Sequence, residues 1–162
     1  MKLYDMKRLL FIFFIMVSTV MVMNAQSGLE INSIFNGRYA TDPNVTETII
    51  SGKNKFLKKH KLNVLATFKG PASSYRSIVE RMVLADASKS IGKNVRYKDG
   101  RLYFGLFILK PIVSNNVRMN RYLYYLDNSN HKNPTVLVVY LEGTLNEQQV
   151  SDFIQSLTSK SK

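Results

Sequence analysis

The sequence predicts an α+β fold with a mostly antiparallel sheet of about six strands, a four-strand C-terminal meander, and helices mainly on one face. The first observation is four consecutive runs of β-branched and aromatic residues, separated by polar turns, in the second half of the chain. The second is a pair of similar runs upstream. The third is three segments with apolar residues three and four positions apart, the spacing of one helical face.

The first 25 residues have the order of a secretory signal peptide. Three basic residues among the first eight precede an uncharged run over 9–23, and Ala25 is the expected last residue before cleavage. This apolar run is shorter than the roughly 20 residues of a transmembrane helix. We therefore expect residues 26–162 to form one exported domain, periplasmic or secreted, without stable membrane insertion after cleavage. An uncleaved anchor is the alternative.

The charge of the chain favours acidic partners. Its 162 residues include 23 Lys and Arg against 11 Asp and Glu, a net charge of +12, and removal of residues 1–25 would leave 20 against 10. Such a balance suits an acidic or cell-envelope partner. Export argues against nucleic acid, and solubility alone is the simpler explanation of the charge.

The region before the long helix predicts one short helix and two strands. Ser27 and Glu30 fit a capping box, and the apolar residues that follow predict a helix over 28–36. Strands are expected over 45–50 and 62–68.

A basic run separates these two strands. It contains five lysines in nine residues: Lys53, Lys55, Lys58, Lys59 and Lys61. The run is a candidate site for phosphate or sulfate groups, and a solvated surface is the alternative.

The longest predicted helix begins at Ser73 or Ser74 and runs to about Lys89. Asp86 lies at the end of its apolar stripe, where an unpaired carboxylate would be costly to bury. We expect Asp86 to be a buried carboxylate paired with Arg, Tyr or a backbone donor. The alternatives are a site carboxylate of raised pKa and an exposed residue on a frayed helix end.

The predicted meander strands cover 95–98, 101–109, 117–126 and 135–141. Asp99 and Gly100 favour a two-residue hairpin turn between the first two. That turn would place Lys98 opposite Arg101, Tyr97 opposite Leu102, and Val95 opposite Phe104. Pro111 is expected to end the second strand.

The third meander strand carries an aromatic and basic group whose exposure the sequence leaves open. Its members are Arg118, Arg121, Tyr122, Tyr124 and Tyr125. They form either an interaction surface for sugars, peptides or a partner protein, or ordinary cross-strand packing. After the last strand, Thr144 and Glu147 fit a second capping box at the start of a terminal helix.

Few residues indicate chemistry. The chain has no cysteine, which excludes disulfides and thiol catalysis, and no nucleotide-binding or serine-hydrolase motif is present. His60 and His131 have no ligand spacing. We interpret His60 as a surface or half-buried histidine and His131 as an ordinary exposed loop residue. No metal and no cofactor is indicated.

The order of these features resembles small exported proteins of unknown function from Bacteroidetes-type bacteria. The resemblance lies in the junction Asn24 to Gln26, in Gly28 to Phe35, in Thr48 to Gly52, in Met82 to Asp86, and in the tyrosine-rich meander. It implies export and carries no activity. We therefore expect a non-enzymatic binding or interaction module of the cell envelope. The alternatives are a small hydrolase whose site only the fold assembles, and a polyanion binder that acts through Lys53 to Lys61.

Overall fold

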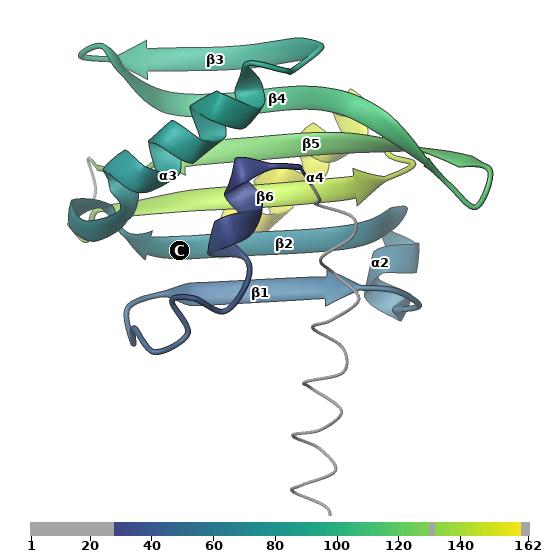
Figure 1. The fold of residues 1–162 in the computed structure, drawn as a ribbon, viewed down its shortest axis with the longest axis horizontal. Helices are drawn as coiled ribbons and strands as arrows, with labels where there is room; N and C mark the ends of the chain where they lie inside the picture. The colour runs from purple at the N-terminus through teal and green to yellow at the C-terminus, as the bar shows by residue number, and fades with distance from the viewer. Residues whose placement is uncertain (1–27, 130–131, 160–162) are drawn as a thin grey trace, which may run out of the picture.

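The computed structural model describes residues 28–129 and 132–159. The predicted signal peptide and His131 lie outside these ranges. Figure 1 shows one sheet with helices in front of it and behind it. The elements in chain order are η2 (Glu30–Ile34), β1 (Thr46–Ser51), α2 (Lys55–Lys59), β2 (Leu62–Pro71), α3 (Ala72–Ala87), β3 (Gly92–Lys98), β4 (Arg101–Ser114), β5 (Val117–Asp127), β6 (Thr135–Gly143) and α4 (Glu147–Ser159).

The sheet has six strands in the order β1-β2-β6-β5-β4-β3, and every neighbouring pair is antiparallel. The α+β class and the C-terminal meander are therefore confirmed. The meander runs from β3 to β6, and the hairpin of β1 and β2 adds to its far side through β6. The two outer strands, β1 and β3, are thus separated by four others.

Helix α3 and the short helix η2 cover one face of the sheet. Helix α3 follows β2 and crosses this face toward β3, the outer strand at the opposite edge of the sheet (Figure 1). Val79 and Val83 of α3 and Ile34 of η2 are fully buried against sheet residues that include Phe68 and Tyr125. This face holds the larger of the two hydrophobic clusters.

Helices α4 and α2 cover the other face. Val150 and Phe153 of α4 pack with Tyr124 and Leu141 of the sheet, and Leu57 of α2 joins the same cluster. Helices therefore cover both faces of the sheet, whereas the sequence predicted them mainly on one face. The reason is that β5 and β6 carry apolar side chains on both sides, so each face must be shielded from water.

The Asp99-Gly100 hairpin forms as predicted, with one change of register. Both turn residues have positive φ, and Lys98 pairs with Arg101. The expected pairing of Val95 with Phe104 is wrong, because a β-bulge places Val95 opposite Gly105. A bulge inserts one unpaired residue and shifts every pair beyond it.

Pro111 does not end β4, which continues to Ser114. A second irregularity between Leu109 and Ile112 takes up the proline, so the β4–β5 ladder resumes beyond it. Asn115 and Asn116, both with positive φ, close this hairpin. Asparagine tolerates that conformation better than other side chains do.

Two predicted helix starts are corrected by the structure. Helix α3 begins at Ala72 with no side-chain cap, rather than at Ser73 or Ser74. Before α4, the reciprocal capping pair is Asn146 and Gln149, whose backbone N–H groups each donate to the other's side chain at 2.9–3.1 Å. The expected pair, Thr144 and Glu147, is two residues too early.

We expect hydrogen exchange to rank the strands by position. The amides of β6 lie between two strands and under helices on both faces, whereas β3 is an outer strand with mostly exposed side chains. Exchange through local opening should therefore be slowest in β6 and fastest in β3. Mass spectrometry of deuterated peptides measures this directly, and equal protection of the two strands would contradict the described order.

Candidate anion-binding site

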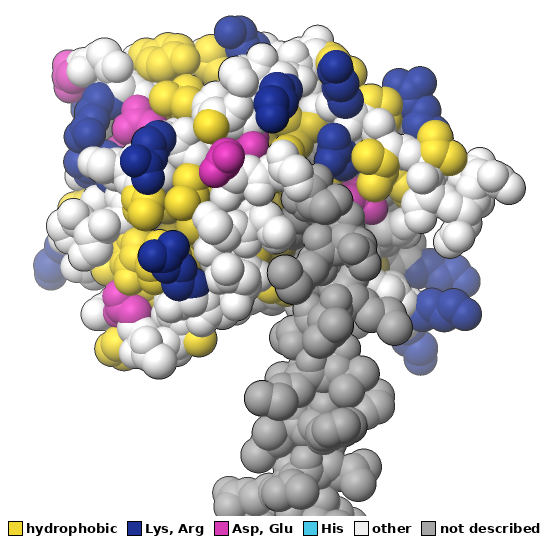
Figure 2. Space-filling model, viewed as in Figure 1, with side chains coloured by type: hydrophobic (Ala, Val, Ile, Leu, Met, Phe, Trp, Pro, Cys, Tyr) yellow, Lys and Arg dark blue, Asp and Glu magenta, His cyan; other side chains and the backbone are white. Residues whose placement is uncertain are grey.

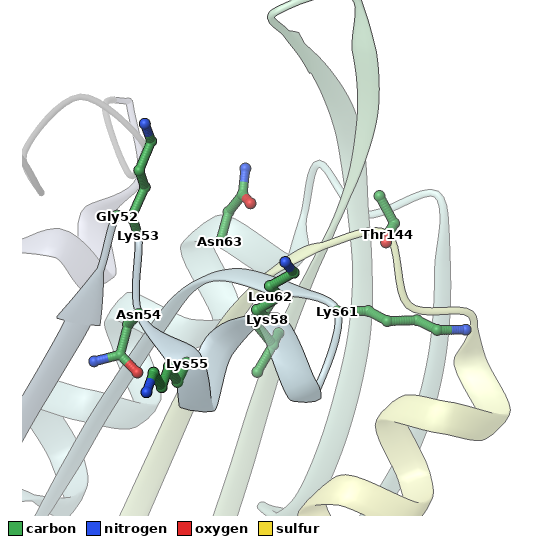
Figure 3. A pocket seen from close by; sticks show the side chains of 9 residues that line it. All are labelled: Gly52, Lys53, Asn54, Lys55, Lys58, Lys61, Leu62, Asn63 and Thr144. Carbon is green, nitrogen blue, oxygen red and sulfur yellow. The ribbon is translucent and has the colours of Figure 1, made fainter.

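A hollow of about 650 Å³ lies at one end of the sheet, where β1, β2 and β6 meet the turn that contains α2 (Figure 3). We call it the lysine hollow. It is lined by Gly52, Lys53, Asn54, Lys55, Lys58, Lys61, Leu62, Asn63 and Thr144. Four of the five lysines of the basic run line it, so the fold gathers most of that run around one space.

Local backbone chemistry shapes the near side of the hollow. β1 ends at Ser51, and Gly52 turns the chain with a φ of 77°. The side chain of Asn54 then accepts a hydrogen bond from the backbone N–H of Phe56 at 2.8 Å and caps α2. Capping satisfies a donor that the first helical turn leaves unpaired.

One apolar anchor and an aromatic cluster hold α2 against the sheet. Leu57 is buried in the cluster beneath α4. On its other side, the His60 ring lies between Phe56 and Phe153, with ring centroids 4.7 and 5.0 Å away. The short helix therefore has a fixed orientation, with its lysines directed to water.

The far side of the hollow depends on a close backbone approach. The N–H of Thr144 donates to the carbonyl oxygen of Lys61 at 2.9 Å. A Cβ at Gly143 would lie 2.2 Å from that same oxygen, so only glycine fits there. Lys61 itself has a φ of 57°. This conformation costs a non-glycine residue about 1 kcal/mol, so the chain retains a lysine where glycine would be less strained.

The lysines of the run are exposed and carry unneutralised charge. Within residues 28–129 and 132–159, none of the five takes part in an ion pair. Dark blue side chains gather at the lower right of Figure 2, over the position of α2 in Figure 1. In Figure 3, Lys53 and Lys58 extend toward the open space beside Asn63, whereas Lys55 and Lys61 point outward on opposite sides. The positive charge is therefore spread around the hollow.

Lys59 and His60 face a second, smaller hollow of about 330 Å³ between α2 and α4. Asp152 and Gln149 of α4 also line it, and Lys61 lies between the two hollows. The presence of a carboxylate makes this second space less favourable for an anion than the lysine hollow.

Asp86 lies away from both hollows and caps η2. Its two carboxylate oxygens accept hydrogen bonds from the backbone N–H groups of Glu30 and Ile31, at 2.8 and 2.9 Å. Burial raises the pKa of Asp86, although these two donors act in the opposite direction. The carboxylate that joins α3 to η2 thus takes the place of a cap from Ser27, which lies outside the described residues.

Replacement of Asp86 by alanine should destabilise the fold by about 1–3 kcal/mol, because two N–H donors would lose their partner. Urea unfolding monitored by circular dichroism measures this difference. The matched control is Asp152→Ala on the exposed surface of α4, which should change stability by no more than about 0.5 kcal/mol. Equal effects of the two substitutions would contradict the capping role.

The tyrosines of the predicted interaction surface are buried, so they do not present an aromatic face to a partner. Tyr122 donates its hydroxyl to the carbonyl oxygen of Leu145 at 3.0 Å, and burial raises the pKa of Tyr124 to about 12. Tyr122 and Tyr124 lie beneath α4, whereas Tyr125 lies beneath α3. Alternation along a strand sends neighbours to opposite faces, which separates these side chains.

The two arginines of that group are also apart. Arg121 donates from Nε to the carbonyl oxygen of Lys110 at 2.8 Å. Arg118 is exposed nearer the hairpin turn and pairs with Val113 across the ladder. The group of five residues is therefore mainly architectural, apart from Arg118.

Glu142 is a buried carboxylate near the end of β6. It accepts a hydrogen bond from the hydroxyl of Tyr140 at 3.0 Å. Burial raises the pKa of Glu142 above its ordinary value, while Tyr140 and the charge of Arg121 partly offset that effect.

Ionisation of buried Glu142 should destabilise the parent at neutral pH, and the variant Glu142→Gln should lack this effect. Folded Glu142 holds its proton more tightly than the unfolded chain does, so the parent loses stability as pH rises above the ordinary value of 4.5. The amide keeps an acceptor for Tyr140 and does not titrate. Urea unfolding at pH 4.5 and 7.5 should show the stability of the parent, relative to the variant, falling with pH. A constant difference would contradict the assignment.

A third hollow, of about 150 Å³, lies at the opposite end of the sheet. Arg76 of α3 forms an ion pair with Asp127 at 2.9 Å, and the hydroxyl of Ser129 bridges the same two residues. These contacts tie α3 to the end of β5. Ser129 donates to a carboxylate that is already paired, which makes it a structural contact rather than an activated nucleophile.

Sequence reasoning found the lysines but missed the polar residues around them. Asn63 and Thr144 come from the start of β2 and the segment after β6, and only the pairing of these strands brings them to the basic run. Within the described ranges, no group of three side chains suited to a metal ion occurs. Among the same residues, no helix combines the length and apolar character needed to cross a membrane.

Comparison with known proteins adds a family assignment. No curated protein and no solved structure matched the chain. A family model, described as a family of unknown function (DUF6108), matches residues 18–154, which include every strand of the sheet. The chain therefore belongs to this family of unknown function, DUF6108.

Proposed function

We propose that this protein is an exported, non-enzymatic binding module that holds anionic groups of a cell-envelope partner in the lysine hollow. The observation that carries the proposal is the hollow of about 650 Å³, lined by four lysines without ion-pair partners among the described residues. The signal-peptide pattern of the first 25 residues supports export.

The composition around the hollow favours an anion over a cation or an apolar ligand. Residues 52–63 contain no Asp or Glu, so nothing in this segment offsets the positive charge. The amide of Asn63 and the hydroxyl of Thr144 add neutral hydrogen-bonding groups at the rim. Lysine ammonium groups act as point charges that suit phosphate or sulfate oxygens.

The spread of the lysines favours a ligand with several charges. The side chains extend in different directions around the hollow instead of converging on one point (Figure 3). A single small anion would contact only part of this set. A surface or polymer with repeated anionic groups would engage all four, and would gain from each contact.

The proposal predicts that three lysine substitutions abolish polyanion binding. The variant Lys53→Gln/Lys55→Gln/Lys58→Gln removes three charges without changing Lys61, whose backbone is strained. On a heparin column, the parent should be retained at low salt and released by added salt, whereas this variant should pass through. The test uses the chain from Gln26, which contains both core clusters.

The matched control removes the same charge from the opposite end of the sheet. The variant Lys69→Gln/Lys98→Gln/Lys132→Gln changes three exposed lysines that line no part of the hollow. It should be retained as the parent is. Equal loss of retention in both variants would show that only net charge matters, and would overturn the proposed site.

A further inference from the structure

The β4–β5 hairpin extends beyond the rest of the sheet, at the same end as the lysine hollow. The last β5–β6 pair joins Asn120 to Gly143, so the three residues before Asn120 pair only with β4. At about 3.4 Å per residue, the hairpin projects roughly 10 Å past its neighbour. Figure 1 shows this projection on the same side as α2.

The exposed tip of the hairpin is apolar and basic. Val113 is 74% exposed and Val117 is 44% exposed, the largest exposed fractions of any valines in the described chain. Lys110 and Arg118 flank them and are exposed, and residues 110–119 contain no Asp or Glu. Asn115 and Asn116 at the turn supply polar groups at the very end.

The hairpin and the hollow form one continuous surface. Asn63 of the hollow donates from its side-chain amide to the sulfur of Met119 on β5 at 3.5 Å. In Figure 3 the hairpin stands beside the side chains of the hollow. Exposed valines alone are ordinary on protein surfaces. Their position next to unpaired lysines, on a projecting element, is what needs an explanation.

We propose that this end of the sheet docks on the surface of an anionic phospholipid bilayer. The lysine hollow contacts headgroup phosphates, and the tip of the β4–β5 hairpin enters the boundary between headgroups and acyl chains. A boundary 5–10 Å deep matches the projection of the hairpin. Lysines near an anionic surface and buried valines contribute together, as two signals of different physical origin. The inference rests on the proposed function and names its partner.

Vesicle binding tests the proposal. The chain from Gln26 should sediment with vesicles of phosphatidylcholine and phosphatidylglycerol, and should remain in solution with phosphatidylcholine alone. Lys53→Gln/Lys55→Gln/Lys58→Gln should weaken binding by about 100-fold, since each lysine near the surface contributes roughly fivefold. The control Lys69→Gln/Lys98→Gln/Lys132→Gln should reduce it far less.

A second pair of variants isolates the hairpin. Val113→Ser/Val117→Ser should weaken vesicle binding by about tenfold, because less apolar area leaves water. It should leave heparin retention unchanged, and a circular dichroism spectrum like that of the parent would show that the variant is folded. The chain contains no tryptophan, so Val113→Trp supplies a clean fluorescent probe. Its emission should shift to shorter wavelength on anionic vesicles, whereas Tyr97→Trp, at the other end of the sheet, should not shift.

The outcomes separate the two proposals. Retention on heparin without vesicle binding would overturn the membrane inference in favour of a soluble polyanion, and would leave the proposed function in place. Vesicle binding without a shift at position 113 would overturn the role of the hairpin. Failure on both heparin and vesicles would overturn both proposals.

Discussion

The structure depends on the burial of β2 and β6 on both of their faces. Phe68 and Tyr140 point to the side covered by α3 and η2, whereas Leu65 and Leu141 point to the side covered by α4 and α2. Without cysteines, no cross-link can stabilise the domain, and apolar burial provides the main favourable term. The two helical layers are therefore a requirement of this sheet, because its central strands have no polar face to offer to water.

This requirement determines where binding surfaces are located. With both faces covered, solvent reaches the sheet mainly at its two ends and along β1 and β3. At one end, the cation of Arg76 is paired with Asp127, and Ser129 bridges the two residues beside the smallest hollow. The other end carries the lysine hollow and the projecting hairpin, and its cations lack ion-pair partners among the described residues. The two ends of the sheet therefore differ in charge and shape, and this difference, rather than any single residue, distinguishes the candidate binding end.

Local sequence patterns predicted most of the helices and strands. They could not predict which distant residues meet, because that depends on long-range strand pairing. Asp99 and Gly100 specified their hairpin because the turn needs positive φ at both positions, and Ile31 and Ile34 marked one face of a helix. The basic run was visible in the sequence as a candidate site. Its partners Asn63 and Thr144 were not, since the pairing of β2 with β6 brings them together. The exposure of the tyrosines was undecided for the same reason, because it depends on which helix packs on which face.

The pairing of β2 with β6 also bears on how the chain reaches its folded state. β2 is in the first half of the sequence, and its partner β6 is the last strand to be synthesised. Until residues 135–143 are present, the β1–β2 hairpin has no sheet to join, and the cluster beneath α4 cannot form. Contacts between segments so far apart in sequence form slowly, because a long loop must close first. A chain built this way can complete its sheet only late in synthesis, after residues 135–143 have been made.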